Sequence, residues 1–454
     1  MGKARGGRGP RRRSEPVRSQ ASGDSVPALP ATRPGRRAVV LGASLAAVVA
    51  AGCAAGPGSA TQARAADCTT PGVSGDTIKV GLIYPDTGSL TEAFKSARSA
   101  VEGRIGLANA NGGVDGRQIQ LEWRDDAGTP SVNASAAEDL VENQGVLGLI
   151  ELSTAVSGSA GYLDQHGIPV TGLTAESLWN DHANMFSFSY LFVSGSLVST
   201  FGEYAKAQGG TKAAVLQDGA GASAGIADQL VASLASQGIT TVKRVGFTTG
   251  QSSAARAADE IIASKADVIV GTVAMSSIAE TLAAVRARGG NPKVVLSPTG
   301  YDPQLVRQQG PSIAGLTIWL NYTPFEAKSP AIANYESAMA QFAPELAEPD
   351  QEVAVASYIS TDLFVRGLEA AGPCPTRAAF IKNLRAVRDY DAGGLVPGAI
   401  DLSDNRGKAS TCYAFVRVNA AATGFDVVKK PDGSAQWCGQ RLVPGTASAS
   451  GGAG

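Results

Sequence analysis

Residues 77–126 contain a strand–helix–strand pattern that much of the chain repeats. Over 78–83, apolar side chains stand at four positions and indicate a buried strand. From Thr91 onward, apolar residues recur at three- and four-residue spacings, which predicts a helix. The Asn-Gly-Gly sequence at 111–113 ends that helix, because Gly and Asn accept the left-handed backbone of a helix terminus. Alternating apolar residues over 119–123 then predict a second strand.

Predicted helices and strands alternate further along the chain, and an extended aromatic segment at 185–190 divides them into two series. The expected strands are 146–152, 168–171, 213–217, 240–247, 267–272 and 293–297. The expected helices are 132–143, 156–165, 197–208, 226–236, 254–264 and 277–288. This alternation predicts an α/β fold with parallel sheets that helices cover on both faces. One sheet for each series would give two lobes.

The last third of the chain changes this pattern. An extended run at 315–320 precedes three expected helices at 332–342, 353–370 and 377–387. Two final strand-like runs, 412–418 and 425–428, are typical of a β-hairpin.

Small hydroxyl residues and glycine follow several predicted strands, at 87–89, 153–154, 172–174 and 298–300. Ligands of open parallel sheets bind beyond the carboxyl ends of the strands. Helix N-termini at those ends present free N–H groups that suit a carboxylate. Each Ser or Thr is also an ordinary helix cap, but four such strand ends together predict a shared polar cleft.

The charge of the chain is unevenly distributed. The 454 residues are 44% hydrophobic and 17% charged, with a net charge of −1. Residues 1–52 hold ten Lys and Arg against two acidic residues, a net +8, so the remainder carries −9. A mildly acidic body argues against nucleic acid as a partner.

The first 52 residues are typical of an export signal. Arg36 and Arg37 precede an apolar run at 38–51, and small residues then lead to Cys53. Ala-Ala-Gly-Cys resembles the bacterial lipoprotein box, which predicts lipidation of Cys53. A plain secretory cleavage site is the alternative, and the sequence leaves Sec and twin-arginine export open. Residues 53–75 would form a flexible tether, and 444–454 a disordered tail.

Four cysteines follow Cys53, and an even number outside the cytoplasm predicts two disulfides. They are Cys68, Cys374, Cys412 and Cys438. Three pairings are possible from the sequence. None of the cysteines has the close spacing of a zinc site, so no metal is expected.

The sequence Gly-Ala-Ser-Ala-Gly at 221–225 matches the nucleophile elbow G-x-S-x-G and raises a serine hydrolase as an alternative. A triad of the usual order needs a His after the Ser, but His166 and His182 both precede Ser223. The glycines of this region also lack the G-x-G-x-x-G spacing of a dinucleotide loop. We therefore expect no catalytic residue and no cofactor.

Four stretches together resemble a known family. They are IKVGLIYPDTGSL, NANGGVDGR, IQLEWRDD and VLGLIELSTAVSGSAGYLDQHGIPVTGLTAES. From about residue 78 to 428 the chain is similar to type I periplasmic binding proteins of the branched-chain amino acid class, which feed ABC transporters. The resemblance implies two lobes, joined by three hinge crossings, that close on a ligand. Lobe one would hold 76–188 and 322–395, and lobe two 189–321 and 396–443. The crossings would fall near 186–190, 320–323 and 393–399.

The same resemblance implies the disulfide pairing and a ligand site. Pairs Cys68–Cys374 and Cys412–Cys438 would each stay within one lobe and leave closure free. A ligand carboxylate would meet hydroxyl and N–H groups of lobe one, and lobe two would contribute further contacts. The expected site residues are Ser89, Ser153, Thr154, Leu173, Thr174, Ala222, Met275 and Tyr301. Thr299 stands where an acidic partner for a ligand ammonium is expected, and Asp302 is a shifted substitute.

The sequence thus predicts a binding protein rather than an enzyme. It would be exported, anchored by lipid to the outer face of the cell membrane, and monomeric. It would capture an amino acid, an amide or another small carboxylate and deliver it to the membrane subunits of an ABC permease. A ligand-sensing module for a signalling partner is the alternative.

Overall fold

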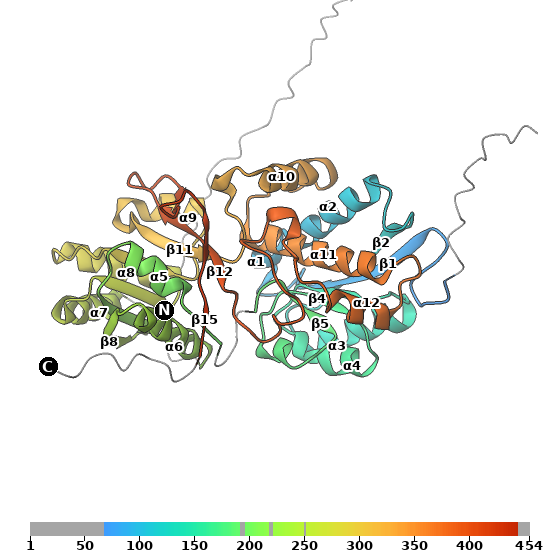
Figure 1. The fold of residues 1–454 in the computed structure, drawn as a ribbon, viewed down its shortest axis with the longest axis horizontal. Helices are drawn as coiled ribbons and strands as arrows, with labels where there is room; N and C mark the ends of the chain where they lie inside the picture. Colours follow the sequence, from blue (N-terminus) through green and yellow to red (C-terminus); the bar gives the residue numbers. More distant parts are fainter. Residues whose placement is uncertain (1–67, 191–195, 218–220, 249–250, 444–454) are drawn as a thin grey trace, which may run out of the picture. The chain divides into compact units, whose positions relative to one another are not determined.

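The computed structural model describes residues 68–190, 196–217, 221–248 and 251–443 (Figure 1). The predicted leader, the lipidation residue Cys53, most of the tether and the tail at 444–454 lie outside the described residues. None of the helices that the structure describes combines the length and hydrophobicity that a bilayer crossing requires.

The first sheet contains five parallel strands. Their order across the sheet is β2 (Gln118–Asp125), β1 (Thr77–Tyr84), β3 (Leu149–Glu151), β4 (Val170–Gly172) and β5 (Met185–Phe186). This agrees with the parallel arrangement that the alternating elements predict.

Helices cover both faces of this sheet because successive residues of a strand point to opposite sides. Ile78 and Leu82 of β1 pack into one apolar cluster, and Ile83 packs into another. The first cluster includes α2 (Ala97–Ala110) and α11 (Glu352–Ala371). The second includes α3 (Pro130–Glu138), α4 (Ala160–Gln165) and the η2 turn (Val156–Gly158). The helices α10 (Pro330–Phe342) and α12 (Arg377–Leu384) pack on α2 and α11, respectively.

The second sheet has eight strands, and most are parallel. Parallel pairs connect β8 (Thr240–Gly246), β7 (Lys212–Gln217), β9 (Val268–Thr272), β10 (Val294–Ser297) and β11 (Leu316–Leu320). Three antiparallel strands from the end of the chain complete it beside β11 (Figure 1). They are β12 (Cys412–Val418), β13 (Phe425–Val427) and β14 (Gln436–Cys438).

The helices that flank the second sheet follow the same two-sided scheme. One face packs against α7 (Gln251–Ser264) and α8 (Met275–Ala287), and the other against α5 (Thr200–Ala207) and α6 (Gly221–Ser236). The described structure therefore confirms the α/β fold with helices on both faces of each sheet.

Several element boundaries differ from the sequence prediction. The helix expected from Thr91 onward is divided into α1 (Thr91–Phe94) and α2 by Lys95 and Ser96. Leu197 and Val198, expected in a helix, form β6, because they pair with β15 (Arg441–Leu442). Such a pairing between distant segments leaves no local pattern in the sequence.

Helix α9 (Pro303–Gln309) was not predicted, although a local signal exists. The Asp302 side chain accepts hydrogen bonds from the backbone N–H groups of Gln304, at 2.7 Å, and Leu305, at 3.3 Å. An Asp followed by Pro is a typical helix start, since Asp caps free N–H groups and Pro lacks one. Asp302 therefore acts as a helix cap.

Both disulfides that the family resemblance implied are present. Cys68 is bonded to Cys374, with 5.5 Å between their Cα atoms, and Cys412 is bonded to Cys438, with 4.0 Å. The second bond joins residues that face each other in β12 and β14.

Gly202 provides a test of the packing between α5 and α6. A Cβ atom at Gly202 would lie 2.0 Å from the carbonyl oxygen of Ser233, so the two helices would have to separate. We expect Gly202→Ala to lower the free energy of unfolding by about 1–3 kcal/mol, as overpacking does. Gly225 in α6 has open space around it, so Gly225→Ala should instead stabilise by roughly 0.5–1 kcal/mol. Urea unfolding of both variants measures the contrast, and equal effects would contradict it.

Candidate functional site

A buried polar network lies where β2 and β3 end. Ser153 donates a hydrogen bond to a carboxylate oxygen of Asp126, and it accepts one from the N–H of Ala155 at 3.0 Å. The Asn133 amide donates to Asp126 at 3.0 Å and to Glu151 at 3.2 Å. Asp126, Asn133, Glu151 and Ser153 are all fully buried. The hydroxyl of Ser153, which we expected at a ligand, is thus occupied by Asp126 in this structure.

Glu151 is the most perturbed carboxyl group of this network. Burial raises the pKa of Glu151 to about 8, the hydrogen bond from Asn133 opposes the rise, and the Asp126 carboxylate adds to it. Burial stabilises the neutral form because a charge loses its hydration there. Near neutral pH, Glu151 therefore holds a proton while it accepts hydrogen bonds from Asn133 and, at 3.2 Å, from Ser159.

Thr174 and Leu173 follow β4 and connect it to neighbouring segments. The buried hydroxyl of Thr174 donates to the carbonyl oxygen of Ser189 at 2.7 Å. The N–H of Leu173 donates to the carbonyl oxygen of Glu151 at 3.1 Å, and its side chain is half-buried. The Thr174 hydroxyl therefore connects the end of β4 to residues 186–190, where the family resemblance implies a crossing.

Ser89 and Thr154 are exposed in the loops after β1 and β3. Met275 is the first residue of α8 and is buried against Gly300. Ala222 lies in the first turn of α6, as does Ser223, and their side chains are outside the described set.

Tyr301 is buried in an aromatic cluster. Its ring stacks on Phe325 with 5.7 Å between centroids, and its hydroxyl donates to Glu326 at 2.5 Å. The same hydroxyl accepts from the N–H of Phe325 at 2.9 Å. These partners explain the place of Tyr301 without a ligand, and its role at a ligand stays a prediction.

The best candidate for a solute site is a pocket of about 280 Å³ beyond the carboxyl ends of β10 and β11. Its volume approaches the lower limit of small-molecule sites, roughly 300 Å³. Five aromatic residues of the described chain contribute to its lining: Tyr190, Phe201, Trp319, Tyr322 and Tyr413. The other lining residues are Ile226, Gln229, Leu230, Pro298, Thr299, Leu320, Asn321, Glu352 and Ala409. The aromatic rings pack closely, with 5.1 Å between the centroids of Phe201 and Trp319.

Two groups of this pocket, Tyr322 and Glu352, have raised pKa values. The hydroxyl of Tyr322 is buried and has no hydrogen-bond partner among the described residues. The Glu352 side chain is exposed. Its pKa is nevertheless raised, because the surrounding protein removes part of its hydration. Because water still reaches this side chain, solvent screens the effect. Burial and then the Glu352 carboxylate raise the pKa of Tyr322, and both residues line the pocket.

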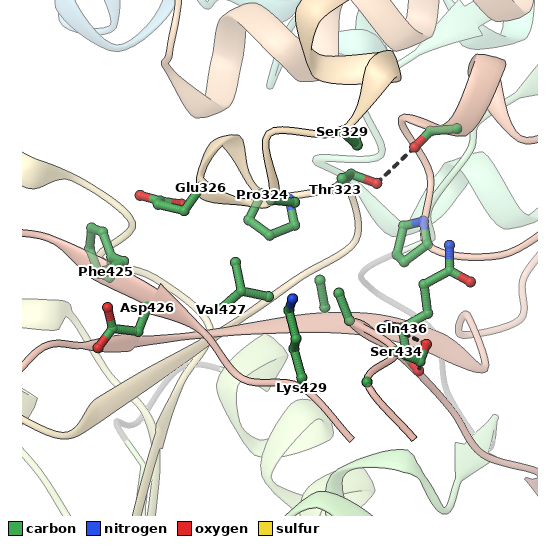
Figure 2. A pocket seen from close by; sticks show the side chains of 16 residues that line it. Thr323, Pro324, Glu326, Ser329, Phe425, Asp426, Val427, Lys429, Ser434 and Gln436 are labelled. Carbon is green, nitrogen blue, oxygen red and sulfur yellow. Dashed lines mark hydrogen bonds between the residues drawn. The ribbon is translucent and has the colours of Figure 1, made fainter. Parts of the chain in front are cut away.

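A larger pocket of about 700 Å³ lies between residues 323–329 and strands β12, β13 and β14 (Figure 2). Two of its polar side chains are engaged within the chain. The Thr323 hydroxyl donates to the carbonyl oxygen of Gly394 at 2.8 Å, and Glu326 accepts from Tyr301. No lining residue of this pocket is among the described side chains with an unpaired buried polar atom. We therefore place the candidate site in the smaller, aromatic pocket.

Among the predicted ligand residues, the seven whose side chains the structure describes do not line the aromatic pocket, and the side chain of Ala222 lies outside the described set. Sequence reasoning missed Tyr190, Trp319, Tyr322 and Glu352. A signal existed at 318–322, where Ile-Trp-Leu-Asn-Tyr places large aromatic residues at a predicted crossing. Glu352 had no such signal, because only the packing of α11 brings its first turn to the ends of β10 and β11.

Comparisons with known proteins agree with this fold. The family model described as periplasmic binding protein matches residues 77–424. Leu/Ile/Val-binding protein homolog 3 of Brucella melitensis is 30% identical over 183 residues, which are 38% of this chain. The match spans 48% of that relative, about half of its length.

Two solved structures share the fold at low identity. The fatty acid ABC transporter substrate-binding protein from Thermomonospora curvata has a TM-score of 0.61 at 19% identity, covering 83% of this chain and 95% of its own. The branched-chain amino acid transporter substrate binding protein LivJ from Streptococcus pneumoniae, in complex with isoleucine, has a TM-score of 0.60 at 18% identity. That match covers 78% of this chain and 100% of LivJ.

The family match extends over most of the chain, and the parallel sheets agree with it. The chain belongs to the periplasmic binding protein family, whose members are solute-binding proteins. Its neighbours bind ligands as different as isoleucine and fatty acid, so the fold alone does not specify a ligand.

Proposed function

We propose that this chain is the extracytoplasmic substrate-binding lipoprotein of an ABC importer. It captures a small solute in the aromatic pocket, within the range of amino acids, amides and other small carboxylates. The observation that carries this proposal is the position of the pocket beyond the carboxyl ends of β10 and β11, where open parallel sheets bind ligands. The family supports it, as do the similar proteins named as Leu/Ile/Val-binding and as ABC transporter substrate-binding.

Capture proceeds by closure of two lobes, 76–188 with 322–395 and 189–321 with 396–443. Tyr190, Asn321 and Tyr322 support this division, because they line the pocket and stand at two of the predicted crossings. Glu352 would come from lobe one and most other lining residues from lobe two. A ligand that touches both sides favours the closed state by the extra contacts it makes there.

Cys53 anchors the chain by lipid to the outer face of the membrane, where a monomer delivers solute to permease subunits. No bond is made or broken in this process. The hydrolase alternative has little support, because His166 and His182, the two histidines of the sequence, both precede Ser223. A ligand-sensing module would share the fold and differ in its docking partner.

Thermal unfolding of the purified protein with a library of amino acids, amides, amines and aromatic acids tests the proposal. A true ligand should raise Tm, because at a hundredfold excess over Kd it stabilises the protein by about 2.7 kcal/mol. The library compound should be recovered unchanged. A library that leaves Tm unaltered, or one compound that is converted to a product, would contradict the proposed function.

A further inference from the structure

The described lining of the aromatic pocket contains negative but no positive charge, and this imbalance indicates which ligands it favours. The described lining contains a single charged side chain, the carboxylate of Glu352. The remaining polar side chains, such as Gln229, Thr299 and Asn321, are uncharged. An anionic solute would therefore find a negative charge in the pocket lining and no described cation to balance its own charge.

The hydroxyl groups expected to hold a carboxylate do not change this balance. Ser153 donates to Asp126, and Thr174 donates to the carbonyl oxygen of Ser189. Arg441 is not among the described lining residues of this pocket, and it donates to the carbonyl oxygen of Ala409 at 3.1 Å. Its guanidinium is thus engaged with the backbone rather than in the lining.

Aromatic faces and a carboxylate form a favourable environment for an organic cation. The negative face of an aromatic ring attracts a cation, and Trp and Tyr do so most strongly. Trp319, Tyr190 and Tyr413 supply such rings, and Glu352 supplies the opposite charge. Desolvation by the surrounding protein works against the ionised form of Glu352, and an ammonium group beside it would offset that cost.

We propose that Glu352 recognises the ammonium group of an aromatic or apolar amine, and that this class of cation is the solute of the pocket. The inference rests on the proposed capture of a small solute in this pocket, and it assigns the pocket an amine in place of a carboxylate. The family resemblance led us to expect an acidic residue at the position of Thr299, after β10. Thr299 and Glu352 line the same pocket. Glu352 of α11 would therefore supply the carboxylate that is missing at the end of β10.

Three probes of similar shape test the proposal by calorimetric titration of the full chain at pH 7. Benzylamine is a cation, benzyl alcohol is neutral and benzoate is an anion. We expect benzylamine to bind about tenfold more tightly than benzyl alcohol, the gain of a charge-assisted hydrogen bond. Benzoate should bind most weakly. Equal affinity for the amine and the alcohol, or tighter binding of benzoate, would overturn the inference.

Glu352→Gln isolates the carboxylate. This variant should weaken benzylamine about tenfold and change benzyl alcohol by less than about twofold, because only the cation loses a charged partner. Glu348→Gln is the matched control: it makes the same charge change at an exposed residue outside the pocket lining and should leave both affinities unaltered. If Glu352→Gln weakened the amine and the alcohol equally, Glu352 would be a packing residue and the proposal would fail.

The two proposals fail in different ways. If the library of the preceding section yields an anionic ligand while benzylamine does not bind, the cation inference is wrong and solute binding stands. If neither the library nor the three probes bind, both proposals are wrong.

Discussion

Replacement of Cys68 and Cys374 by serine is expected to lower the free energy of unfolding by about 2–5 kcal/mol, the usual effect of losing a native disulfide. This bond connects residues separated by 306 positions, so it restricts the unfolded chain strongly. It also holds the beginning of the described chain against the segment between α11 and α12. The buried Arg117 guanidinium joins both sides, with hydrogen bonds of 2.8 Å to the Ser74 carbonyl oxygen and 2.5 Å to that of Pro373.

The second disulfide provides the control. Cys412 and Cys438 are separated by only 26 positions, so the chain-entropy model gives an effect smaller by about 2 kcal/mol when both become serine. Urea unfolding of the two double variants under oxidising conditions measures the difference. A larger loss from the Cys412 and Cys438 replacement would show that chain entropy does not dominate.

The stability of the protein should fall as the pH rises from about 5 to 8, because of Glu151. Its pKa is near 8 in the folded protein, against 4.5 for the group without the protein environment. Between these values the folded state binds the proton more tightly than the unfolded state, so each rise in pH favours unfolding. The contribution is at most about 1.4 kcal/mol per pH unit. It is fully present below about pH 4.5 and lost above pH 8.

Glu151→Gln should remove this contribution, because glutamine stays neutral while keeping the size of the side chain. We expect the free energy of unfolding of the variant, relative to the native protein, to rise steadily between pH 5 and pH 8. Glu138→Gln, at an exposed position of α3, the helix that carries Asn133, is the control and should follow the native protein. Parallel pH profiles of Glu151→Gln and the native protein would refute the assignment.

Most of the fold could be predicted from the sequence because local patterns carry it. The periodicity of 78–83, 119–123 and 268–270 corresponds to β1, β2 and β9. Features that depend on distant pairing were missed or shifted. Leu197 and Val198 became a strand only because β15 lies beside them, and β14 was not expected at all.

The candidate site was harder to predict than the fold. Polar residues at strand ends such as Ser153 and Thr174 were visible in the sequence, but the same hydroxyls also satisfy buried carboxylates and backbone carbonyl groups. Their role at a ligand stays a prediction. The pocket itself combines β11, α6 and the first turn of α11, and only the folded chain brings Glu352 near Tyr322.

Strand β12 comes late in the chain, yet it lies directly beside β11. During synthesis, the edge of β11 that pairs with β12 therefore stays unpaired until residues 412–418 have left the ribosome. A polypeptide that stops at residue 411 would present this open strand to other molecules, and open strands readily pair between chains. Forms of this protein that end before β12 should consequently aggregate rather than remain folded and functional.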